Sequence, residues 1–188
     1  MQADIDGLLA ELEALSEREG GMWNVGPQGG ALLAWLIGLL GARRVLEVGT
    51  SNGYSALWMA RALAREADEG ALVTLEIEPG KIDMAHQNVK RAGLERVVTI
   101  VEGPAVASLQ ALGGAFDLVF IDADKGRYVD YLREVRRLIR PGSLVVADNI
   151  LSHPKETQPY RDEVEADSTF DSVLLPIAGG LLVSRFRT

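Results

Sequence analysis

Short apolar runs alternate with amphipathic segments along most of the chain, and this order restricts the folds that the chain can adopt. Arg44–Val48 and Phe116–Ile121 are two such runs, and a polar turn and a helical pattern follow each of them. Strands that are apolar on both sides are typical of a parallel sheet with helices on both of its faces. The repeated order of strand and helix favours the same arrangement. The sequence therefore predicts a doubly wound α/β fold.

Apolar periodicity and turn residues give the expected bounds of each element. The strands expected in the parallel part are Arg44–Val48, Ala71–Ile77, Val97–Val101, Phe116–Ile121 and Ser143–Ala147. The expected helices are Asp4–Glu19, Pro27–Leu40, Tyr54–Arg65, Pro79–Arg91, Val106–Leu112 and Tyr128–Ile139. The residues expected to end helices are Gly20-Gly21, Gly41, Gly93 and Pro141-Gly142. The segment Leu151–Tyr160 is interpreted as a loop.

The last part of the chain has a different pattern. Ser172–Ile177 and Leu181–Phe186 are two strand-like runs, and Ala178-Gly179-Gly180 joins them. Two strands with so short a glycine-containing connection predict a hairpin, so the sheet is expected to end in an antiparallel pair. Because no linker, repeat or low-complexity segment interrupts the pattern, residues 1–188 are expected to form one domain. The helices of residues 1–41 are expected to pack on it.

Charge and composition exclude several functions. The formal net charge is −8, so the surface is expected to repel the phosphates of nucleic acids. The chain contains no cysteine, which excludes disulfides and thiolate metal sites and fits a reducing compartment. The longest apolar run, Ala31–Leu40, is too short to span a bilayer, and no secretory signal pattern precedes it. We therefore expect a cytoplasmic protein without nucleic acid or membrane partners.

The segment Glu47–Ser55 joins a strand to a helix and has the sequence Glu-Val-Gly-Thr-Ser-Asn-Gly-Tyr-Ser. Its glycines permit positive φ and let the backbone approach a ligand at the carboxyl ends of the strands. A dinucleotide fold would carry G-x-G-x-x-G, whereas Gly49 and Gly53 form G-x-x-x-G. The Glu47 carboxylate would be unfavourable beside a pyrophosphate but favourable beside a sulfonium or amino group. The turn thus favours S-adenosylmethionine over NAD, and a purely structural turn is the alternative.

Other segments are expected to line the same ligand site. Glu76 ends the second strand, where an acid binds ribose hydroxyls in this architecture, and a solvated surface acid is the alternative. Glu78 is its rival or a first-turn helix acid. A turn at Gly103–Ala105 can face an adenine, and Asn24-Val25 could cover the methionine end, although both could be plain turns. The residues expected to contact the cofactor are Asn24, Val25, Glu47, Gly49, Thr50, Ser51, Gly53, Tyr54, Ser55, Glu76, Ile77, Gly103, Pro104, Ala105 and Asp122.

Oxygen-bearing side chains follow the fourth and fifth strands. Asp122-Ala-Asp-Lys125 comes directly after one strand, and Asp148-Asn149 follows the next. Because both strands are expected near the first strand, Asp122, Asp148 and Asn149 could converge on one cation. Carboxylates and amides without His or Cys suit Mg²⁺, Mn²⁺ or Ca²⁺. The alternative is that each acid only ends its strand and caps the following segment.

Three motifs together resemble the cation-dependent O-methyltransferases, a family that includes caffeoyl-CoA and catechol O-methyltransferases. The motifs are Glu47–Ser55, Phe116–Lys125 and Val146–Ile150. The resemblance extends from about Asn24 to Arg185. Its most specific parts are Asp-Ala-Asp-Lys and Asp-Asn, since many methyltransferases share the glycine-rich turn.

The resemblance implies a fold, a cofactor and a role for several residues. The fold would be a Rossmann-like sheet of seven strands, mostly parallel with an antiparallel C-terminal strand. The cofactors would be S-adenosylmethionine as methyl donor and a divalent cation, with Mg²⁺ first among the candidates. The implied roles are metal ligation for Asp122, Asp148 and Asn149, proton acceptance for Lys125, ribose binding for Glu76 and a place near the substrate for Asp124. For Lys125, a solvated lysine or an ion-pair partner is the alternative.

The implied reaction is methyl transfer to a hydroxyl group. A divalent cation that binds two vicinal hydroxyls would lower their pKa and align them for attack on the sulfonium methyl. Because no dense basic patch favours a coenzyme A ester, the expected acceptor is a small catechol-like phenol. The resemblance also implies a homodimer, and His153 is expected to be a loop residue. The alternatives are a metal-independent small-molecule methyltransferase, an NAD-binding oxidoreductase and a noncatalytic nucleotide-binding module.

Overall fold

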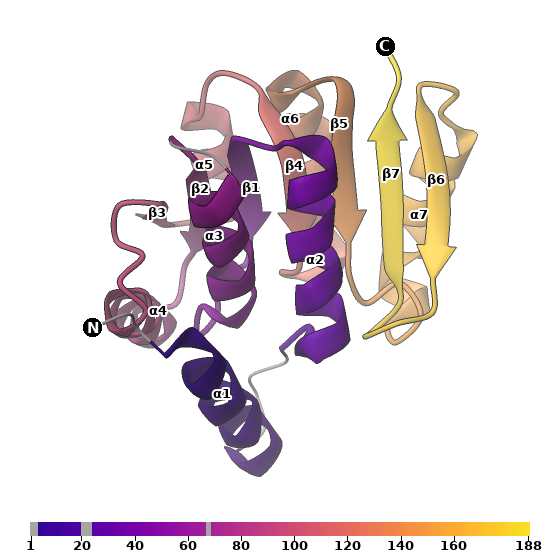
Figure 1. The fold of residues 1–188 in the computed structure, drawn as a ribbon. Coiled ribbons are helices and arrows are strands. Elements are labelled where there is room, and N and C mark those ends of the chain that lie inside the picture. Colours follow the sequence, from indigo (N-terminus) through magenta and orange to yellow (C-terminus); the bar gives the residue numbers. More distant parts are fainter. Residues whose placement is uncertain (1–3, 20–23, 67–68) are drawn as a thin grey trace.

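The computed structural model describes residues 4–19, 24–66 and 69–188, and these residues build one sheet of seven strands (Figure 1). The strand order across the sheet is β3-β2-β1-β4-β5-β7-β6. The strands are β1 (Arg44–Val48), β2 (Ala71–Glu76), β3 (Val98–Glu102), β4 (Phe116–Ile121), β5 (Ile139–Ala147), β6 (Phe170–Leu175) and β7 (Leu181–Phe186). Strands β1 to β5 pair in parallel, and β7 pairs antiparallel with both β5 and β6. The predicted fold class is confirmed.

Helices cover both faces of this sheet. The helices are α1 (Ile5–Glu19), α2 (Gly26–Leu40), α3 (Tyr54–Glu66), α4 (Pro79–Arg91), α5 (Ala105–Ala111), α6 (Tyr128–Val135) and α7 (Pro154–Ala166). Helices α1 to α4 contribute to one apolar core, and α5, α6 and α7 contribute to the other. Two short 3₁₀ turns, Lys125–Arg127 and Arg136–Leu138, flank α6.

The two cores explain why the central strands are apolar on both sides. Successive side chains of a strand point to opposite faces, so Val45 belongs to one core and Leu46 to the other. Both side chains are fully buried. Glu47 is the exception in β1, because it carries an ionisable side chain and yet has no exposed surface.

The predicted end of one helix is wrong. The expected helix Tyr128–Ile139 stops as an α-helix at Val135, and β5 already begins at Ile139. Pro141-Gly142 therefore lies inside β5 instead of ending a helix. The pairing explains how a proline fits, because the register of β4 and β5 shifts between Phe116 and Leu118 at this end of the sheet.

The segment interpreted as a loop, Leu151–Tyr160, is mostly helical. Helix α7 begins with Pro154 in its first turn and contains Pro159. Its buried side chains are Thr157, Tyr160 and Val164. Their spacing of three and four residues is helical, but two prolines close together in the sequence obscured it.

Apart from Pro141-Gly142, the glycines expected to end helices do so where the structure describes them. Gly41 has φ 57° and ends α2 in the left-handed conformation. Gly20-Gly21, expected to end the first helix, lies outside the described residues. Among the described helices, none has the length and apolar character that crossing a membrane requires.

Candidate functional site

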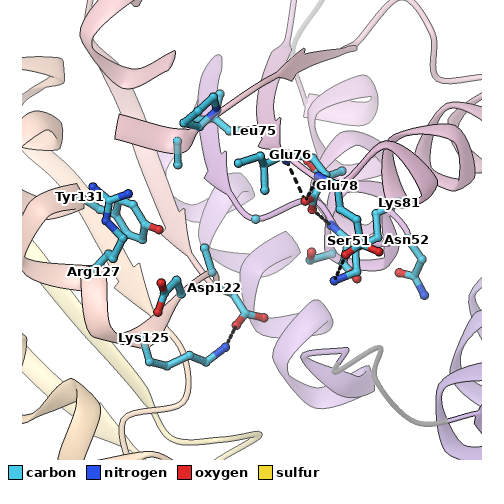
Figure 2. Close-up of a pocket in the computed structure, with 18 of the residues that line it drawn as sticks. Ser51, Asn52, Leu75, Glu76, Glu78, Lys81, Asp122, Lys125, Arg127 and Tyr131 are labelled. Carbon is cyan, nitrogen blue, oxygen red and sulfur yellow. Dashed lines mark hydrogen bonds and ion pairs between the residues drawn. The ribbon is translucent and has the colours of Figure 1, made fainter. Parts of the chain in front are cut away.

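A cavity of about 380 Å³ opens at the carboxyl ends of the central strands (Figure 2). In a parallel sheet these ends share one edge, so turns that are far apart in the sequence meet there. The lining residues are Asn24, Val25, Gly49, Thr50, Ser51, Asn52, Tyr54, Ser55, Leu75, Glu76, Ile77, Glu78, Lys81, Gly103, Pro104, Ala105, Asp122, Ala123, Asp124, Lys125, Arg127 and Tyr131. Most residues that the sequence predicted as cofactor contacts therefore lie around one cavity, and the exceptions are Glu47 and Gly53.

The glycine-rich turn packs tightly between two neighbouring strands. The backbone N–H groups of Gly49 and Thr50 both donate to the Leu75 carbonyl at 3.1 Å. Gly49 has φ +105°, and a Cβ there would overlap the carbonyl oxygen of Asp122. Glycine is therefore required at this position by both conformation and space. The turn is held against the ends of β2 and β4, where it forms the floor of the cavity.

The Glu76 carboxylate is fixed in place by three backbone donors. Ser51 N donates to Oε2 at 2.8 Å, and Ile77 N and Glu78 N donate to Oε1 at 2.8 and 3.0 Å. These bonds link the second strand to the glycine-rich turn and aim the carboxylate along the cavity wall. Its remaining lone pairs could accept hydroxyl groups of a ligand. Glu78 instead forms an ion pair with Lys81 at 3.1 Å, so Glu76 is the better candidate for ribose binding.

Glu47 lies behind the cavity wall and not in it. Ser55 Oγ donates to Glu47 Oε1 at 2.5 Å, and Thr74 Oγ1 donates to Oε2 at 2.5 Å. Thr74 Oγ1 in turn lies 2.5 Å from Thr50 Oγ1. Burial raises the pKa of Glu47 to about 8, and the two hydroxyl hydrogen bonds only partly oppose this effect. The sequence argument expected this carboxylate at the ligand itself, whereas two hydroxyl-bearing residues separate them.

Two further wall segments come from parts of the chain that are far apart in the sequence. Val25 is buried, and the Asn24 amide donates to the Leu12 carbonyl at 3.2 Å, so this segment is tied back to α1. Gly103 has φ +131°, and its N–H donates to the Glu76 carbonyl at 2.8 Å. Both segments line the cavity, as predicted, although their contacts with a cofactor stay a prediction.

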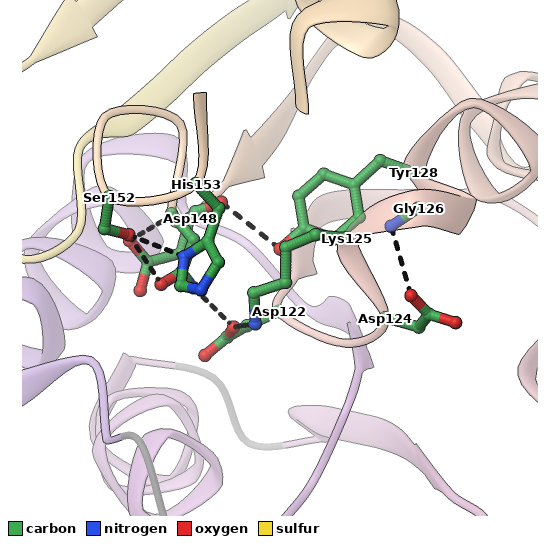
Figure 3. A network of polar contacts seen from close by, with 9 residues as sticks. Asp122, Asp124, Lys125, Gly126, Tyr128, Asp148, Ser152 and His153 are labelled. Atoms are coloured by element: carbon green, nitrogen blue, oxygen red, sulfur yellow. Dashed lines mark hydrogen bonds and ion pairs between the residues drawn. The ribbon is translucent and has the colours of Figure 1, made fainter. Parts of the chain in front are cut away.

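Two acidic side chains meet at the ends of β4 and β5 (Figure 3). Asp122 Oδ1 accepts hydrogen bonds from Lys125 Nζ at 3.1 Å and from Asn149 Nδ2 at 2.8 Å. Asp148 Oδ1 accepts from Asn149 N at 2.6 Å. Asn149 itself has φ 65°, a left-handed conformation that turns the chain sharply after β5. The structure thus brings together the three predicted metal ligands and the predicted base.

The electrostatics of this cluster suit a cation. Burial raises the pKa of Asp122, and the nearby Lys125 ammonium opposes the effect. Burial and the Asp122 charge raise the pKa of Asp148 to about 7. The buried Asp148 carboxylate and the partly buried Asp122 carboxylate destabilise each other's charged form, and a divalent cation would relieve that repulsion.

The donor set at this cluster fits a hard cation. Carboxylate oxygens of Asp122 and Asp148 and the amide oxygen of Asn149 are the ligand types that Mg²⁺ and Ca²⁺ prefer. The Asn149 Oδ1 now accepts from Ser152 Oγ at 3.0 Å, so cation binding would require this amide to reorient. Across the described ranges, no cluster of three or more His, Cys, Asp or Glu side chains forms a metal site, so the predicted donor set comprises two carboxylates and the Asn149 amide oxygen.

Several residues at the site were not predicted from the sequence. Arg127 and Tyr131 line the cavity, and Tyr128 OH donates to the Asp148 carbonyl at 3.2 Å. The sequence predicted only that Tyr128 and Tyr131 belong to a helix, and their hydroxyl groups are the signal that could have indicated a polar role. Ser152 Oγ lies 3.0 Å from His153 Nδ1 and also reaches Asn149.

The fold and the cavity together define a class of protein. An extended ligand can lie across the carboxyl ends of the central strands, with its hydroxyl groups at Glu76 and its other end at Ser55. The same cavity reaches the acidic cluster through Asp122 and Lys125. These features are those of an α/β enzyme that brings a nucleoside-type cofactor to a second, polar substrate.

Comparisons with known proteins identify the family. The profile of a family described as O-methyltransferase matches residues 2–181. The chain is 38% identical over 190 residues to a catechol O-methyltransferase of Niastella koreensis, covering 93% of this chain and 85% of the relative. It is 43% identical over 149 residues to a catechol O-methyltransferase of Mycobacterium tuberculosis, covering 79% of this chain and 66% of the relative.

Solved structures agree with this assignment. An O-methyltransferase from Bacillus cereus in complex with SAH has a TM-score of 0.87 and 28% identity, covering 97% of this chain and 91% of the other. An O-methyltransferase of Streptomyces achromogenes involved in tomaymycin synthesis, in complex with SAM, has a TM-score of 0.84 and 28% identity, covering 96% and 90%. The chain therefore belongs to the O-methyltransferase family, as its motifs predicted, and it is an O-methyltransferase.

Proposed function

We propose that the protein transfers a methyl group from S-adenosylmethionine to a hydroxyl of a small catechol-like or phenolic acceptor, with the help of a divalent cation. The observation that carries this proposal is the meeting of Asp122, Asn149 and Lys125 at one end of the cavity. Acceptor hydroxyls held at this end would lie next to a donor that occupies the rest of the cavity.

The donor assignment is supported by the cavity walls and by the relatives. Structural neighbours are O-methyltransferases in complex with SAH or SAM. In this chain the fixed Glu76 carboxylate offers acceptors for ribose hydroxyls, and the turn at Gly103–Ala105 lines the same cavity, where it could contact the base. The turn at Gly49 lacks the spacing of a dinucleotide fingerprint, which argues against NAD.

The residues proposed to hold the cation are Asp122, Asp148 and Asn149. A bound divalent cation would supply Lewis acidity, which lowers the pKa of a coordinated hydroxyl. Tyr128 and Ser152 would support the ligands, because they bond the Asp148 carbonyl and the Asn149 side chain. The chain itself thus orients the acceptor and keeps two carboxylates close together.

Lys125 is proposed to accept the hydroxyl proton as a neutral amine, after its ammonium group has released a proton to solvent beside a bound divalent cation. Its Nζ lies 3.1 Å from Asp122 Oδ1 and lines the cavity, so an acceptor bound at the acidic cluster would be within its reach. Loss of the proton makes the acceptor oxygen a nucleophile, and the sulfonium methyl is already an activated electrophile. The remaining task for the protein is alignment of the oxygen with the methyl carbon.

The test is a panel of phenols with a labelled methyl donor, with and without chelator and with Mg²⁺ added back. Label transfer to catechol-type acceptors that stops in chelator and returns with Mg²⁺ is the expected result. Undiminished transfer in excess chelator would select a metal-independent methyltransferase. Tight binding of NAD without binding of S-adenosylhomocysteine would instead indicate an oxidoreductase or a nucleotide-binding module.

We further propose that the protein is a homodimer that forms through α2 and the neighbouring sheet edge. Helix α2 contains no charged side chain, although the chain carries a net charge of −8. Trp35 and Leu39 lie one turn apart on α2 and are 61% and 66% exposed. Val173 on β6 is 52% exposed, and its pairing partner Val183 faces the same core as α2.

This surface suits a second copy of the same chain. Figure 1 shows β7 and β6 beside α2, with α7 behind these strands. One copy therefore offers both an apolar helix ridge and an apolar strand face, which a twofold axis can pair with each other. Because both copies carry the same net charge, an uncharged patch is where they can approach most closely.

A further inference from the structure

Glu47 occupies a place that the catalytic proposal does not use. Its carboxyl group is fully buried beneath the floor of the cavity, and its two oxygens contact Ser55 Oγ and Thr74 Oγ1 at 2.5 Å each. Ser55 lines the cavity and contacts Glu47 directly, so a single side chain separates the carboxyl group from a ligand there, whereas Thr74 and Thr50 both intervene on the other side. The carboxyl group is therefore close enough to interact electrostatically with a charged ligand without contacting it.

The hydroxyl groups around Glu47 can serve both of its protonation states. Ser55 and Thr74 donate to a carboxylate, and the same oxygens can accept from a protonated carboxyl group. The bond between Thr50 and Thr74 can also run in either direction. The network can thus adapt to a change of charge by rotation of hydroxyl hydrogens alone.

The charged groups that act on Glu47 favour its neutral form. Asp122 at the end of β4 and Glu76 at the end of β2 are both carboxylates, and their charges raise its pKa further. Helix α2, which packs on α3, has no charged side chain. The charged residues of α3 lie beyond its first turn, starting with Arg61. Together with burial, these surroundings raise the pKa of Glu47 to about 8.

The proposed donor would bring a cation to this position. If its ribose lies at Glu76, its amino-acid end can follow the glycine-rich turn to Ser55, which lines the same cavity as Glu76. That end carries an ammonium group in both S-adenosylmethionine and S-adenosylhomocysteine. A cation near a buried carboxyl group favours its charged form.

We propose that binding of the cofactor's ammonium end is coupled to the release of one proton from Glu47. The O–H bond of the buried carboxyl group breaks, the proton passes to solvent, and the carboxylate then balances the ammonium charge through Ser55 and Thr74. This inference rests on the proposed function, because it needs the cofactor in this cavity. Glu47 is thus a positioning residue that makes cofactor affinity depend on pH.

The experiment is calorimetric titration of the whole chain at pH 7 in buffers of different ionisation enthalpy, with S-adenosylhomocysteine as the probe. The expected release approaches about one proton per bound ligand, because a carboxyl group with pKa near 8 is mostly protonated at this pH. 5′-Methylthioadenosine, which lacks the amino-acid end, should bind with little release.

Two variants assign the proton to its source. Glu47→Gln keeps a neutral, hydrogen-bonding side chain of the same shape and should bind S-adenosylhomocysteine with the release abolished. Glu76→Gln is the matched control: it should weaken binding but keep the release.

The outcomes separate this inference from the proposed function. Binding of S-adenosylhomocysteine without proton release, or equal release in Glu47→Gln, would refute the coupling and leave the cofactor assignment intact. Absence of binding to the wild-type chain would instead refute the proposed function. If Glu47→Gln fails to fold, the two probes still decide the question in the wild-type chain, because they differ only at the amino-acid end.

Discussion

Single side chains at the end of β4 carry the proposed chemistry, and Lys125 is the most direct to test. Lys125→Met removes the amine but keeps most of the side-chain volume. We expect kcat to fall by about 10²- to 10⁴-fold, the usual contribution of a general base, with donor affinity nearly unchanged. Steady-state rates with catechol and calorimetry with S-adenosylhomocysteine check this. Lys155→Met, at an exposed position of α7, is the control and should keep wild-type rates.

Asp148 tests the cation proposal at the same scale. Asp148→Asn keeps the shape of the side chain and its hydrogen bond from Asn149 but removes the charge that a cation needs. We expect turnover to be lost, while S-adenosylhomocysteine still binds, because Asp148 does not line the cavity. If residual activity remains, the Mg²⁺ concentration that gives half of it should be at least about 10-fold higher than in the wild type. Full activity with unchanged metal response would mean that no cation binds here.

At the residue scale, the sequence predicted which strand ends carry the site but not where every side chain points. Asp122 and Asp148 follow apolar strands directly, so their meeting could be foreseen from the parallel arrangement. Glu47 could not be placed in the same way. Its direction depends on Thr74 of the next strand and on Ser55 of α3, which approach it only in the folded chain.

At the scale of elements, the glycine-rich turn links the sheet to the cavity, and Gly49→Ala tests that link. The added Cβ would be strained by the positive φ of this residue and would also overlap the Asp122 carbonyl oxygen. The backbone cost alone is about 1–3 kcal/mol, so we expect a larger loss of stability and weaker donor binding. Gly142→Ala is a matched control, since Gly142 has φ +93° but no neighbouring atom within 4 Å of a Cβ. Urea unfolding of both variants should show the smaller loss for Gly142→Ala.

Elements with a simple local pattern were predicted well, and those that depend on distant contacts were not. The bounds of β1, β4, α4 and β7 agree with the sequence because apolar runs and turn residues mark both ends. Helix α7 was missed, since Pro154 and Pro159 resemble loop signals. Its apolar residues Tyr160 and Val164 pack with the core beneath β5, a contact that no local pattern reveals.

At the scale of the whole molecule, Glu47 is expected to make stability depend on pH. Its pKa is about 8 in the folded chain and near the ordinary 4.5 when unfolded, so the folded state holds the proton more tightly. The resulting stabilisation is complete below pH 4.5 and is lost as pH rises toward 8. Relative to Glu47→Gln, the wild-type free energy of unfolding should therefore fall by up to roughly 1.4 kcal/mol per pH unit in this interval. Urea unfolding at several pH values without cofactor measures it, and parallel curves for the two proteins would contradict it.

Assembly is the remaining property of the whole molecule, and the uncharged face of α2 makes it testable. Leu39→Glu places a carboxylate on the exposed apolar ridge next to Trp35. In a twofold dimer each interface receives the new charge twice, and burying an unpaired charge costs several kcal/mol. We expect the wild-type chain to sediment as a dimer. The Leu39→Glu substitution should raise the dimer dissociation constant at least about 100-fold, so that this variant sediments mainly as a monomer. Ala166→Glu adds the same charge at an exposed position of α7, on the other face of the sheet, and should leave the dimer intact. A wild-type monomer at micromolar concentration, or a dimer that Leu39→Glu does not weaken, would show that this face does not join two copies.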